Sequence, residues 1–364
     1  MIYRARTSKA ISAWIADRRG AWSHPKPETL DPRPEVVCPG FHLYRGFVGC
    51  PAWAAGQPCS YCFLRTTFNG QRDPELRDGV AWGGLLADCE DCHRQDDDGS
   101  CRVPECSIPI DVAPARAAVR RWLGVRHCPD CAWRDDCRSS RCEMYRPSVL
   151  NAGELADSLA FPPADNPHIA MLLDLFSDPA TNPHGHKLLL LTKAGLEATQ
   201  AHLSGRTPSE NVICSFSLGN VCGGPLEAHW QPIEGRTDAI CWALALGWRV
   251  RLRLDPLMWD AEIRQDSYYP GEHAYQVGLA FSSASSAQSA DSRFPELITL
   301  GTLRHRGGRV KLPPEERAAI YRSALEGLRT GGYEGPVGLC KETPEMIREV
   351  LGIEPSEMQC NCTA

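Results

Sequence analysis

From residue 146 onward, strand-like runs alternate with helix-like runs, and this alternation limits the possible folds more than any other feature. Each strand-like run is short and rich in aliphatic residues, and the run that follows is long enough for a crossover helix. Strand, helix and strand at this spacing form a parallel sheet with right-handed crossovers. The strand-like runs and their helical partners are 147–151 with 154–160 and 168–176, 187–191 with 195–203, 212–216 with 237–246, 248–254 with 272–281, and 297–303 with 314–329.

A further strand within residues 41–48 brings the total to about six strand and helix units, the number of a partial barrel. We therefore predict an α/β fold, a partial (β/α)6 barrel with a Cys-rich metal-binding insertion. The chain has 364 residues, of which 43% are hydrophobic, and this is enough for such a domain with a packed core. Residues 282–292, rich in Ser and Ala, are expected to form a flexible loop between units.

The chain divides into five segments by composition. Residues 1–37 form a lead-in with a short helix at 8–19 and a Pro-rich run, which cannot be helical throughout. The first strand and a cysteine loop occupy 38–69, the Cys-rich insertion 70–147, the rest of the barrel 148–335, and a Cys-containing C-terminal segment 336–364.

No run of about eighteen apolar residues occurs, and the first residues lack the apolar core of a signal peptide. We therefore predict a cytoplasmic protein without a membrane partner. The net charge of −6 gives no general attraction to nucleic acid, so any phosphate contact must come from a local basic patch.

A loop at the carboxyl end of the first strand carries Cys50, Cys59 and Cys62 with the spacing C-x8-C-x2-C. Barrel enzymes keep their chemistry at this end of their strands. A short loop brings the three sulfurs together at little entropic cost, and a missing fourth thiolate leaves the open position that metal chemistry requires. The alternative is a structural zinc knuckle that shares a thiol from elsewhere.

The chain contains 18 Cys and no export signal, which favours metal ligation over disulfides because the cytosol keeps thiols reduced. The insertion contains two blocks of four cysteines. Four thiolates suit a tetrahedral zinc and a fully ligated iron–sulfur cluster equally well, so both remain open. The first block is Cys89, Cys92, Cys101 and Cys106, and the second is Cys128, Cys131, Cys137 and Cys142.

Two pieces of this loop, Gly49-Cys50 and the residues from Cys59-Ser-Tyr61-Cys62-Phe63 to Thr67, resemble the cluster loop of the spore photoproduct lyase family, within the radical S-adenosylmethionine (SAM) superfamily. That family normally has C-x3-C-x2-C, so this loop is five residues longer. The resemblance implies a [4Fe–4S] cluster on Cys50, Cys59 and Cys62, SAM as a cofactor, and a reductant such as flavodoxin or ferredoxin. It implies a catalytic role for Tyr61 in a hydrogen relay, although Phe63 replaces the family's second Tyr.

The same resemblance extends to the ends of later strands. It implies that Glu154, in Asn-Ala-Gly-Glu154-Leu-Ala-Asp157-Ser158, holds the SAM amino group and that Lys193 pairs with the SAM carboxylate. The segment from Asn151 to Ser158 lacks the Cys that donates a hydrogen atom in the lyase. The full set of cofactor-binding candidates is Glu154, Asp157, Ser158, Lys193, Ser217 and Asn220.

Arg249, Arg251 and Arg253 alternate with apolar residues, which places three guanidinium groups on one face of a strand. They either face a polar lumen, where they could bind substrate phosphates or carboxylates, or form a solvated face. Arg304 lies in a basic Gly-rich loop that also suits a phosphate backbone. Near the end of the chain, Cys340, Cys360 and Cys362 could complete a further metal site or serve redox chemistry.

These features favour a radical SAM enzyme that acts on a pyrimidine or thymine-derived base in nucleic acid, by repair or base modification. A radical SAM enzyme with auxiliary clusters that modifies a peptide or small molecule is the second hypothesis. The third is a non-catalytic, zinc-rich protein that binds nucleic acid.

Overall fold

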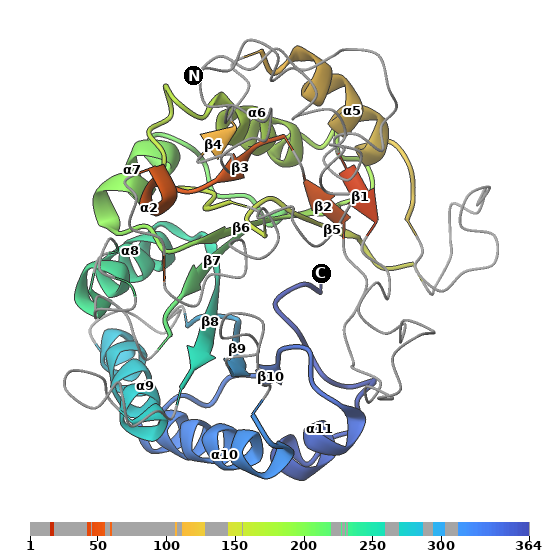
Figure 1. The fold of residues 1–364 in the computed structure, drawn as a ribbon. Helices are drawn as coiled ribbons and strands as arrows, with labels where there is room; N and C mark the ends of the chain where they lie inside the picture. Colours follow the sequence, from red (N-terminus) through yellow and green to blue (C-terminus); the bar gives the residue numbers. More distant parts are fainter. Residues whose placement is uncertain are drawn as a thin grey trace, which may run out of the picture.

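The fold was analysed in a computed structural model of the whole chain (Figure 1). The structure describes residues 15–17, 42–44, 46–54, 59, 106–107, 111–127, 145–154, 156–219, 227, 230, 232–258, 269–286, 294–302 and 312–363.

Among these residues, the main sheet has eight strands in the order β1-β2-β5-β6-β7-β8-β9-β10. Only β1 is antiparallel to its neighbour, and the other seven strands pair in parallel. Figure 1 shows the sheet as an open arc, which makes it a half-barrel. The strands are β1 Ile15–Asp17, β2 His42–Tyr44, β5 Val149–Asn151, β6 Lys187–Thr192, β7 Val212–Ser217, β8 Arg249–Leu257, β9 Leu297–Thr302 and β10 Val337–Leu339.

The helices lie along the outer side of the arc (Figure 1). From β5 onward each parallel strand is followed by a helix, as a crossover requires. The helices are α2 Pro51–Ala54, α5 Ala113–Leu123, α6 Pro167–Ser177, α7 Leu196–Leu203, α8 Ile233–Leu246, α9 Pro270–Ser286, α10 Pro314–Thr330 and α11 Pro344–Leu351.

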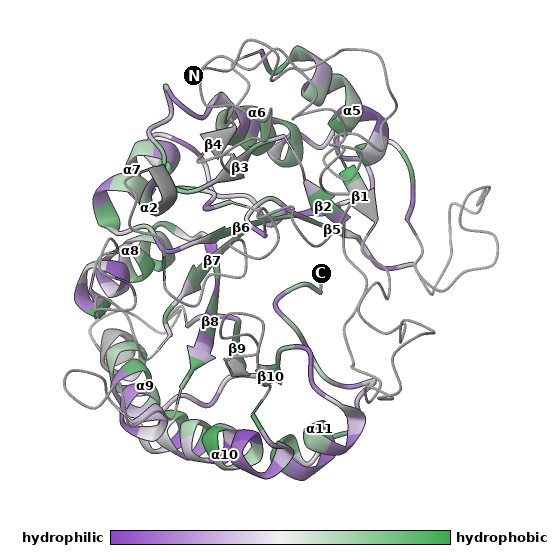
Figure 2. Cartoon of the chain, viewed as in Figure 1, coloured by the Kyte–Doolittle hydropathy of each residue, from purple (hydrophilic) through white to green (hydrophobic). Residues whose placement is uncertain are grey.

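The central strands are apolar along nearly their whole length. Every residue of β7 and β9 is buried, and so are four of the six residues of β6. Figure 2 shows β6 and β7 as mainly hydrophobic, whereas α10 mixes hydrophilic and hydrophobic residues. This is typical of parallel strands that are covered on both faces and of helices that bury one side.

Helices α9 and α10 approach each other through glycines. A Cβ atom at Gly327 would collide with the carbonyl of Gly271, and one at Gly331 would lie 2.8 Å from Gly278 Cα. Side chains at these positions would therefore push the two helices apart.

The predicted α/β half-barrel is confirmed, and each later strand lies close to its expected position. The sheet has one parallel strand more than the six units expected, because β10 and α11 lie in the segment 336–364. The prediction of a helix at residues 8–19 is wrong for Ile15–Asp17, which form strand β1, with Ile15 paired to Tyr44 at the edge of the sheet.

Two further expectations are corrected. Residues 154–160 were expected to be helical, but the described residues among them form a turn, because Asp157 accepts hydrogen bonds from the amides of Leu159 and Ala160. The flexible loop expected at 282–292 begins later, since α9 continues to Ser286.

The Cys-rich segment 70–147 contributes directly to the half-barrel. Helix α5 buries Val119, Trp122 and Leu123 in the main hydrophobic core and packs against α6. Strand β4 Cys106–Ser107 pairs with β3 Val48–Gly49 beside the cysteine loop. The side chains of the two four-Cys blocks lie outside the described residues. Among the described helices, none combines the length and apolar character needed to cross a membrane.

Candidate functional site

The polar residues predicted to bind cofactor follow the carboxyl ends of neighbouring parallel strands. Glu154 follows β5, Lys193 follows β6, and Ser217 ends β7. Because the strands run in parallel, these ends meet at one edge of the sheet, which is where α/β enzymes bind ligands.

Cys59 of the cysteine loop lies at this edge, beside Lys193. Cys50 stands between β3 and α2, and both Cys50 and Cys59 are buried, with 9% and 7% exposure. The Lys193 ammonium donates a hydrogen bond to Cys59 Sγ at 3.4 Å. A cation at this distance stabilises a thiolate, the form of cysteine that binds a metal. Cys62 and Tyr61 lie outside the described residues.

Lys193 is the first member of a chain of buried charges. Its Nζ lies 2.5 Å from Glu227 Oε1, and Glu227 Oε2 lies 2.5 Å from Arg236 Nη2. The side chains of Glu227 and Arg236 are fully buried. Burial raises the pKa of Glu227, and the Arg236 guanidinium opposes that shift. Arg236 also donates to the Ser217 carbonyl at 2.8 Å, which connects the chain to the end of β7.

Asp157 fixes the turn after β5 against the end of β6. Its Oδ1 accepts from the Thr192 hydroxyl at 2.6 Å, and its Oδ2 accepts from the Lys193 amide at 2.6 Å. Burial raises the pKa of this carboxyl, and the two hydrogen bonds act in the opposite direction. Both oxygens are therefore engaged by protein donors, and Asp157 positions Lys193.

Glu154 is brought to the same edge by the residue before it. A Cβ atom at Gly153 would collide with the backbone of Leu191, so the turn can pack this closely on β6 only with glycine. Glu154 Oε1 then lies 3.6 Å from the ammonium of Lys341, which follows β10. Lys341 has a φ of 54°, a left-handed conformation that is strained for a residue with a side chain.

The three arginines of β8 are all paired within the protein. Arg249 and Arg251 both bind Glu296, with Arg249 Nε 2.7 Å from its Oε2, and Arg253 Nη2 lies 2.5 Å from Asp255 Oδ2. The sequence left open whether these arginines face a polar lumen or form a solvated face. Arg251 is only 4% exposed, so a solvated face does not describe this residue. Arg304 and Asn220 lie outside the described residues.

The C-terminal cysteines approach this edge from β10. Arg253 Nη2 lies 3.8 Å from Cys340 Sγ, and Cys362 interacts electrostatically with both Glu154 and Arg253. Among the described residues, no group of three or more His, Cys, Asp or Glu side chains is arranged to hold a metal ion. The metal or redox role of Cys340, Cys360 and Cys362 therefore stays a prediction from the sequence.

Several buried polar atoms have no hydrogen-bond partner within the described part of the chain. Asn151 Nδ2 lies at the end of β5, Ser158 Oγ lies in the turn that follows, and Thr299 Oγ1 belongs to β9. Buried polar atoms are normally satisfied, so these three leave donors and acceptors available to a polar ligand.

The chain is similar to solved structures of spore photoproduct lyase. The lyase complexed with dinucleoside spore photoproduct is 10% identical, has a TM-score of 0.47, and matches over 86% of this chain and 80% of that chain. A lyase variant with bound AdoMet and dinucleoside spore photoproduct is 11% identical, with a TM-score of 0.45 over 85% and 79% of the two chains. A scan against protein-family models gives no match, and a search of curated proteins gives none. The half-barrel architecture follows from the strand pairing of the chain itself.

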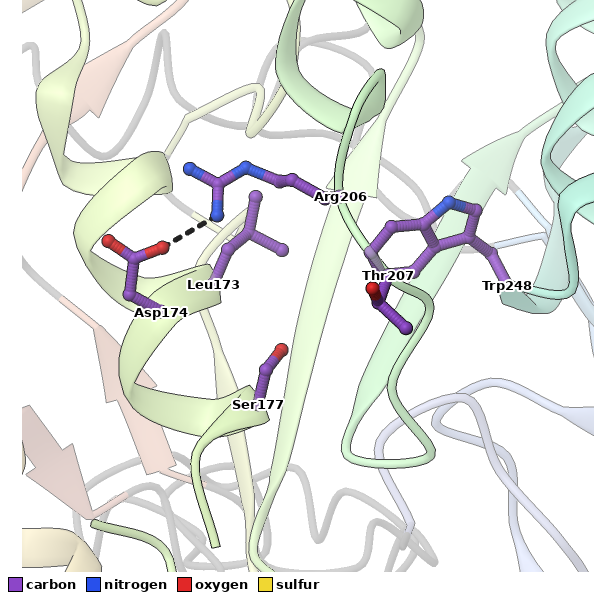
Figure 3. Close-up of a pocket in the computed structure, with 6 residues that line it drawn as sticks. All are labelled: Leu173, Asp174, Ser177, Arg206, Thr207 and Trp248. Atoms are coloured by element: carbon purple, nitrogen blue, oxygen red, sulfur yellow. Dashed lines mark hydrogen bonds and ion pairs between the residues drawn. The ribbon is translucent and has the colours of Figure 1, made fainter. Parts of the chain in front are cut away.

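A small pocket lies at the opposite end of the strands. Figure 3 shows it between α6 and the residues that precede β7 and β8, with Asp174 and Arg206 joined by an ion pair of 2.6 Å. This ion pair is partly exposed, and none of the predicted site residues lines the pocket, so it is separate from the candidate site. Its lining residues are Leu173, Asp174, Ser177, Arg206, Thr207 and Trp248.

Sequence reasoning missed Glu227, Arg236, Asp255 and Lys341 as members of the candidate site. Lys341 and Asp255 could have been found, because both follow the apolar run of a strand, as Lys193 does. Glu227 and Arg236 gave no such signal, since Glu227 precedes a helix and Arg236 lies within it.

Proposed function

We propose that the chain is a radical SAM enzyme whose cluster is held by Cys50, Cys59 and Cys62. The observation that carries this proposal is the hydrogen bond from Lys193 to Cys59 Sγ at the carboxyl edge of a parallel half-barrel. The donor set fits the group, because thiolates bind iron–sulfur clusters and hydrogen bonds to their sulfurs stabilise them. When bound, such a cluster with one open iron supplies the electron for reductive cleavage of SAM.

In this proposal the Lys193 ammonium binds an anionic group at the edge of the site. Glu227, itself fixed by Arg236, keeps the ammonium in place beside Cys59. Asp157 fixes the backbone of the same lysine, so both ends of the residue are held. A site whose supporting contacts are this complete presents a fixed cation to an anionic group such as a carboxylate.

Glu154 and Ser158 would receive the positively charged part of the cofactor. The Glu154 side chain is only 14% exposed, and its ion pair with Lys341 is as long as 3.6 Å. An ammonium group could compete for a carboxylate held this loosely. The Ser158 hydroxyl, which has no partner among the described residues, adds an uncharged donor and acceptor nearby.

For the substrate we propose a pyrimidine or thymine-derived base in nucleic acid, from the resemblance of the cysteine loop and strand ends to the lyase family. Arg249, Arg251 and Arg253 have internal partners, so they act here by shaping and charging the lumen. Arg304 remains the candidate for contact with a phosphate. Binding that depends on phosphate contacts should weaken as salt rises.

The test is anaerobic purification followed by measurement of iron, sulfide, zinc and reductant-dependent formation of 5′-deoxyadenosine from SAM. We expect iron and sulfide in the wild type and loss of cleavage in Cys59→Ala. Cys241→Ala is the matched control, because this partly exposed thiol on α8 belongs to none of the predicted cysteine groups and its loss should have no effect. Zinc without iron in the wild type, or cleavage retained in Cys59→Ala, would overturn the proposal.

A further inference from the structure

The last residues of the chain are bound inside the arc of the half-barrel. Figure 1 shows the C-terminus within the arc, away from the outer helices. The tail packs on β10 at Gly338, where a Cβ atom would collide with the Gln359 carbonyl. The Ser215 hydroxyl of β7 donates to Asn361 Oδ1 at 2.9 Å. Two strands of the sheet therefore fix the position of the tail.

The side chain of Arg251 from β8 completes this attachment. Its Nη1 donates to the carbonyls of Cys360 and Asn361, at 3.4 Å and 2.9 Å, and to that of Thr363. A guanidinium group that is 4% exposed would be costly to bury without such acceptors. The tail carbonyls thus accept the hydrogen bonds that the buried Arg251 guanidinium needs, and Arg251 in turn holds the tail inside the arc.

A tight turn brings the two cysteines of the tail together. The Thr363 amide and hydroxyl both donate to the Cys360 carbonyl, at 2.9 Å and 2.7 Å. Cys360 and Cys362 are separated by one residue within this turn, and their thiols interact with each other. Little movement of the chain is therefore needed to bring the two sulfurs to bonding distance.

The two thiols differ in their access to solvent. Cys360 is 4% exposed, whereas Cys362 is partly exposed. The guanidinium groups of Arg251 and Arg253 interact with Cys360, and cations beside a thiol favour the reactive thiolate. One accessible thiol and one sheltered thiol beside it form the arrangement that completes a disulfide exchange.

We propose that Cys360 and Cys362 are a redox-active thiol pair that cycles between dithiol and disulfide inside the lumen. The oxidant is a small disulfide such as oxidised glutathione. Cys362 attacks one of its sulfurs while its thiol proton passes to the neighbouring Cys360, and one glutathione thiolate leaves, so that a mixed disulfide remains. Cys360 then loses this proton, and its thiolate attacks Cys362 Sγ and releases the second glutathione. The protein loses two electrons and two protons, and two glutathione thiols are formed. A dithiol reductant reverses the reaction.

This inference uses only the geometry of the tail and does not rest on the proposed function. It places reducing equivalents beside Arg253 and Glu154, at the edge where the candidate site lies. Because both residues also interact with Cys362, a disulfide there would change the surroundings of the site.

The sequence allows a direct test on the full-length protein. Trypsin cleavage after Arg348 releases residues 349–364, a peptide in which Cys360 and Cys362 are the two cysteines. The protein is equilibrated in mixtures of reduced and oxidised glutathione, quenched with acid, alkylated and digested. We expect the peptide to change from doubly alkylated to unalkylated and lighter by two hydrogen atoms, and dithiothreitol to reverse this change.

Two variants sharpen the result. Cys362→Ser should abolish the internal disulfide, whereas Cys241→Ser should leave the oxidation of the tail peptide unchanged. A wild-type tail peptide that remains doubly alkylated in the most oxidising mixture would overturn the proposal. Crosslinking of the tail peptide to the peptide that carries Cys340 would also overturn it, because the pair would then be a different one.

Discussion

The two ends of the parallel strands differ in how they satisfy their buried polar side chains. At the amino end, Trp122 stacks on His127 with a centroid distance of 4.7 Å, and His42 packs edge-on to the same indole at 5.1 Å. His186 accepts from the Ser148 amide at 3.0 Å and interacts with the Val125 carbonyl at 2.9 Å. This end is therefore built from packed rings and backbone hydrogen bonds, and His42 Nδ1 and Trp122 Nε1 have no partner among the described residues.

The carboxyl end contains charges instead. Lys193, Glu227 and Arg236 form a chain in which two of the three side chains are fully buried, and Lys341 holds a strained backbone conformation beside Glu154. Buried charges and strain rarely add stability, and they persist where binding or chemistry needs them. This difference supports the proposal that ligand binding belongs to the carboxyl end, and it predicts that the amino end contributes mainly to stability.

The largest expected effect comes from breaking the buried charge chain. Arg236→Met should lower the free energy of unfolding by about 3–5 kcal/mol, because Glu227 loses its guanidinium partner while it remains buried. Urea unfolding at neutral pH measures this. The double variant Arg236→Met, Glu227→Gln should recover part of the loss, and a single variant as stable as the wild type would show that the chain is not a buried ion network.

The amino end should respond to acid. Burial lowers the pKa of His42 and of His186 from 6.5 to about 3. The unfolded chain therefore takes up protons first as the pH falls below 6.5, so stability is full above that pH and is lost toward pH 3. At pH 5 the loss should be about 1–2 kcal/mol for each histidine.

Urea unfolding at pH 7 and at pH 5 tests this slope. His42→Phe should reduce the pH dependence, because it removes one titrating ring and keeps an aromatic side chain against Trp122. The substitution also removes His42 Nδ1, a buried atom without a partner among the described residues. An unchanged slope in His42→Phe would mean that other groups cause the acid sensitivity.

The smallest expected effect tests how closely the turn after β5 packs on β6. Gly153→Ala should cost about 1–3 kcal/mol, because its Cβ would collide with the backbone of Leu191 and displace the turn that carries Glu154. Gly124→Ala is the matched control, since its Cβ would lie 3.5 Å from the Arg120 carbonyl, an ordinary contact. Thermal unfolding compares the two, and equal losses would show that the turn tolerates a displacement.

The sequence determined the fold class because its signals are local. Apolar runs such as those of β6, β7 and β9 are short and continuous, and the amphipathic run of α10 has helical periodicity, so each could be located without its neighbours. Parallel order then placed Glu154, Lys193 and Ser217 at one edge, as the structure shows. The local signal failed at Ile15–Asp17, within the helix expected at 8–19, because the edge of the sheet at β2 pairs with these residues as a strand.

The tertiary structure alone decided how the charges pair. The sequence placed Arg249, Arg251 and Arg253 on one face, but their partners Glu296, Asp255 and the carbonyls of the tail come from other elements. Likewise nothing near Lys193 in the chain indicated Glu227, and nothing near Cys340 indicated that residues 360–362 would return to its side of the lumen. The alternation of side chains along a strand depends on that segment alone. Ion pairing and burial depend on distances between segments, and only the folded chain fixes those distances.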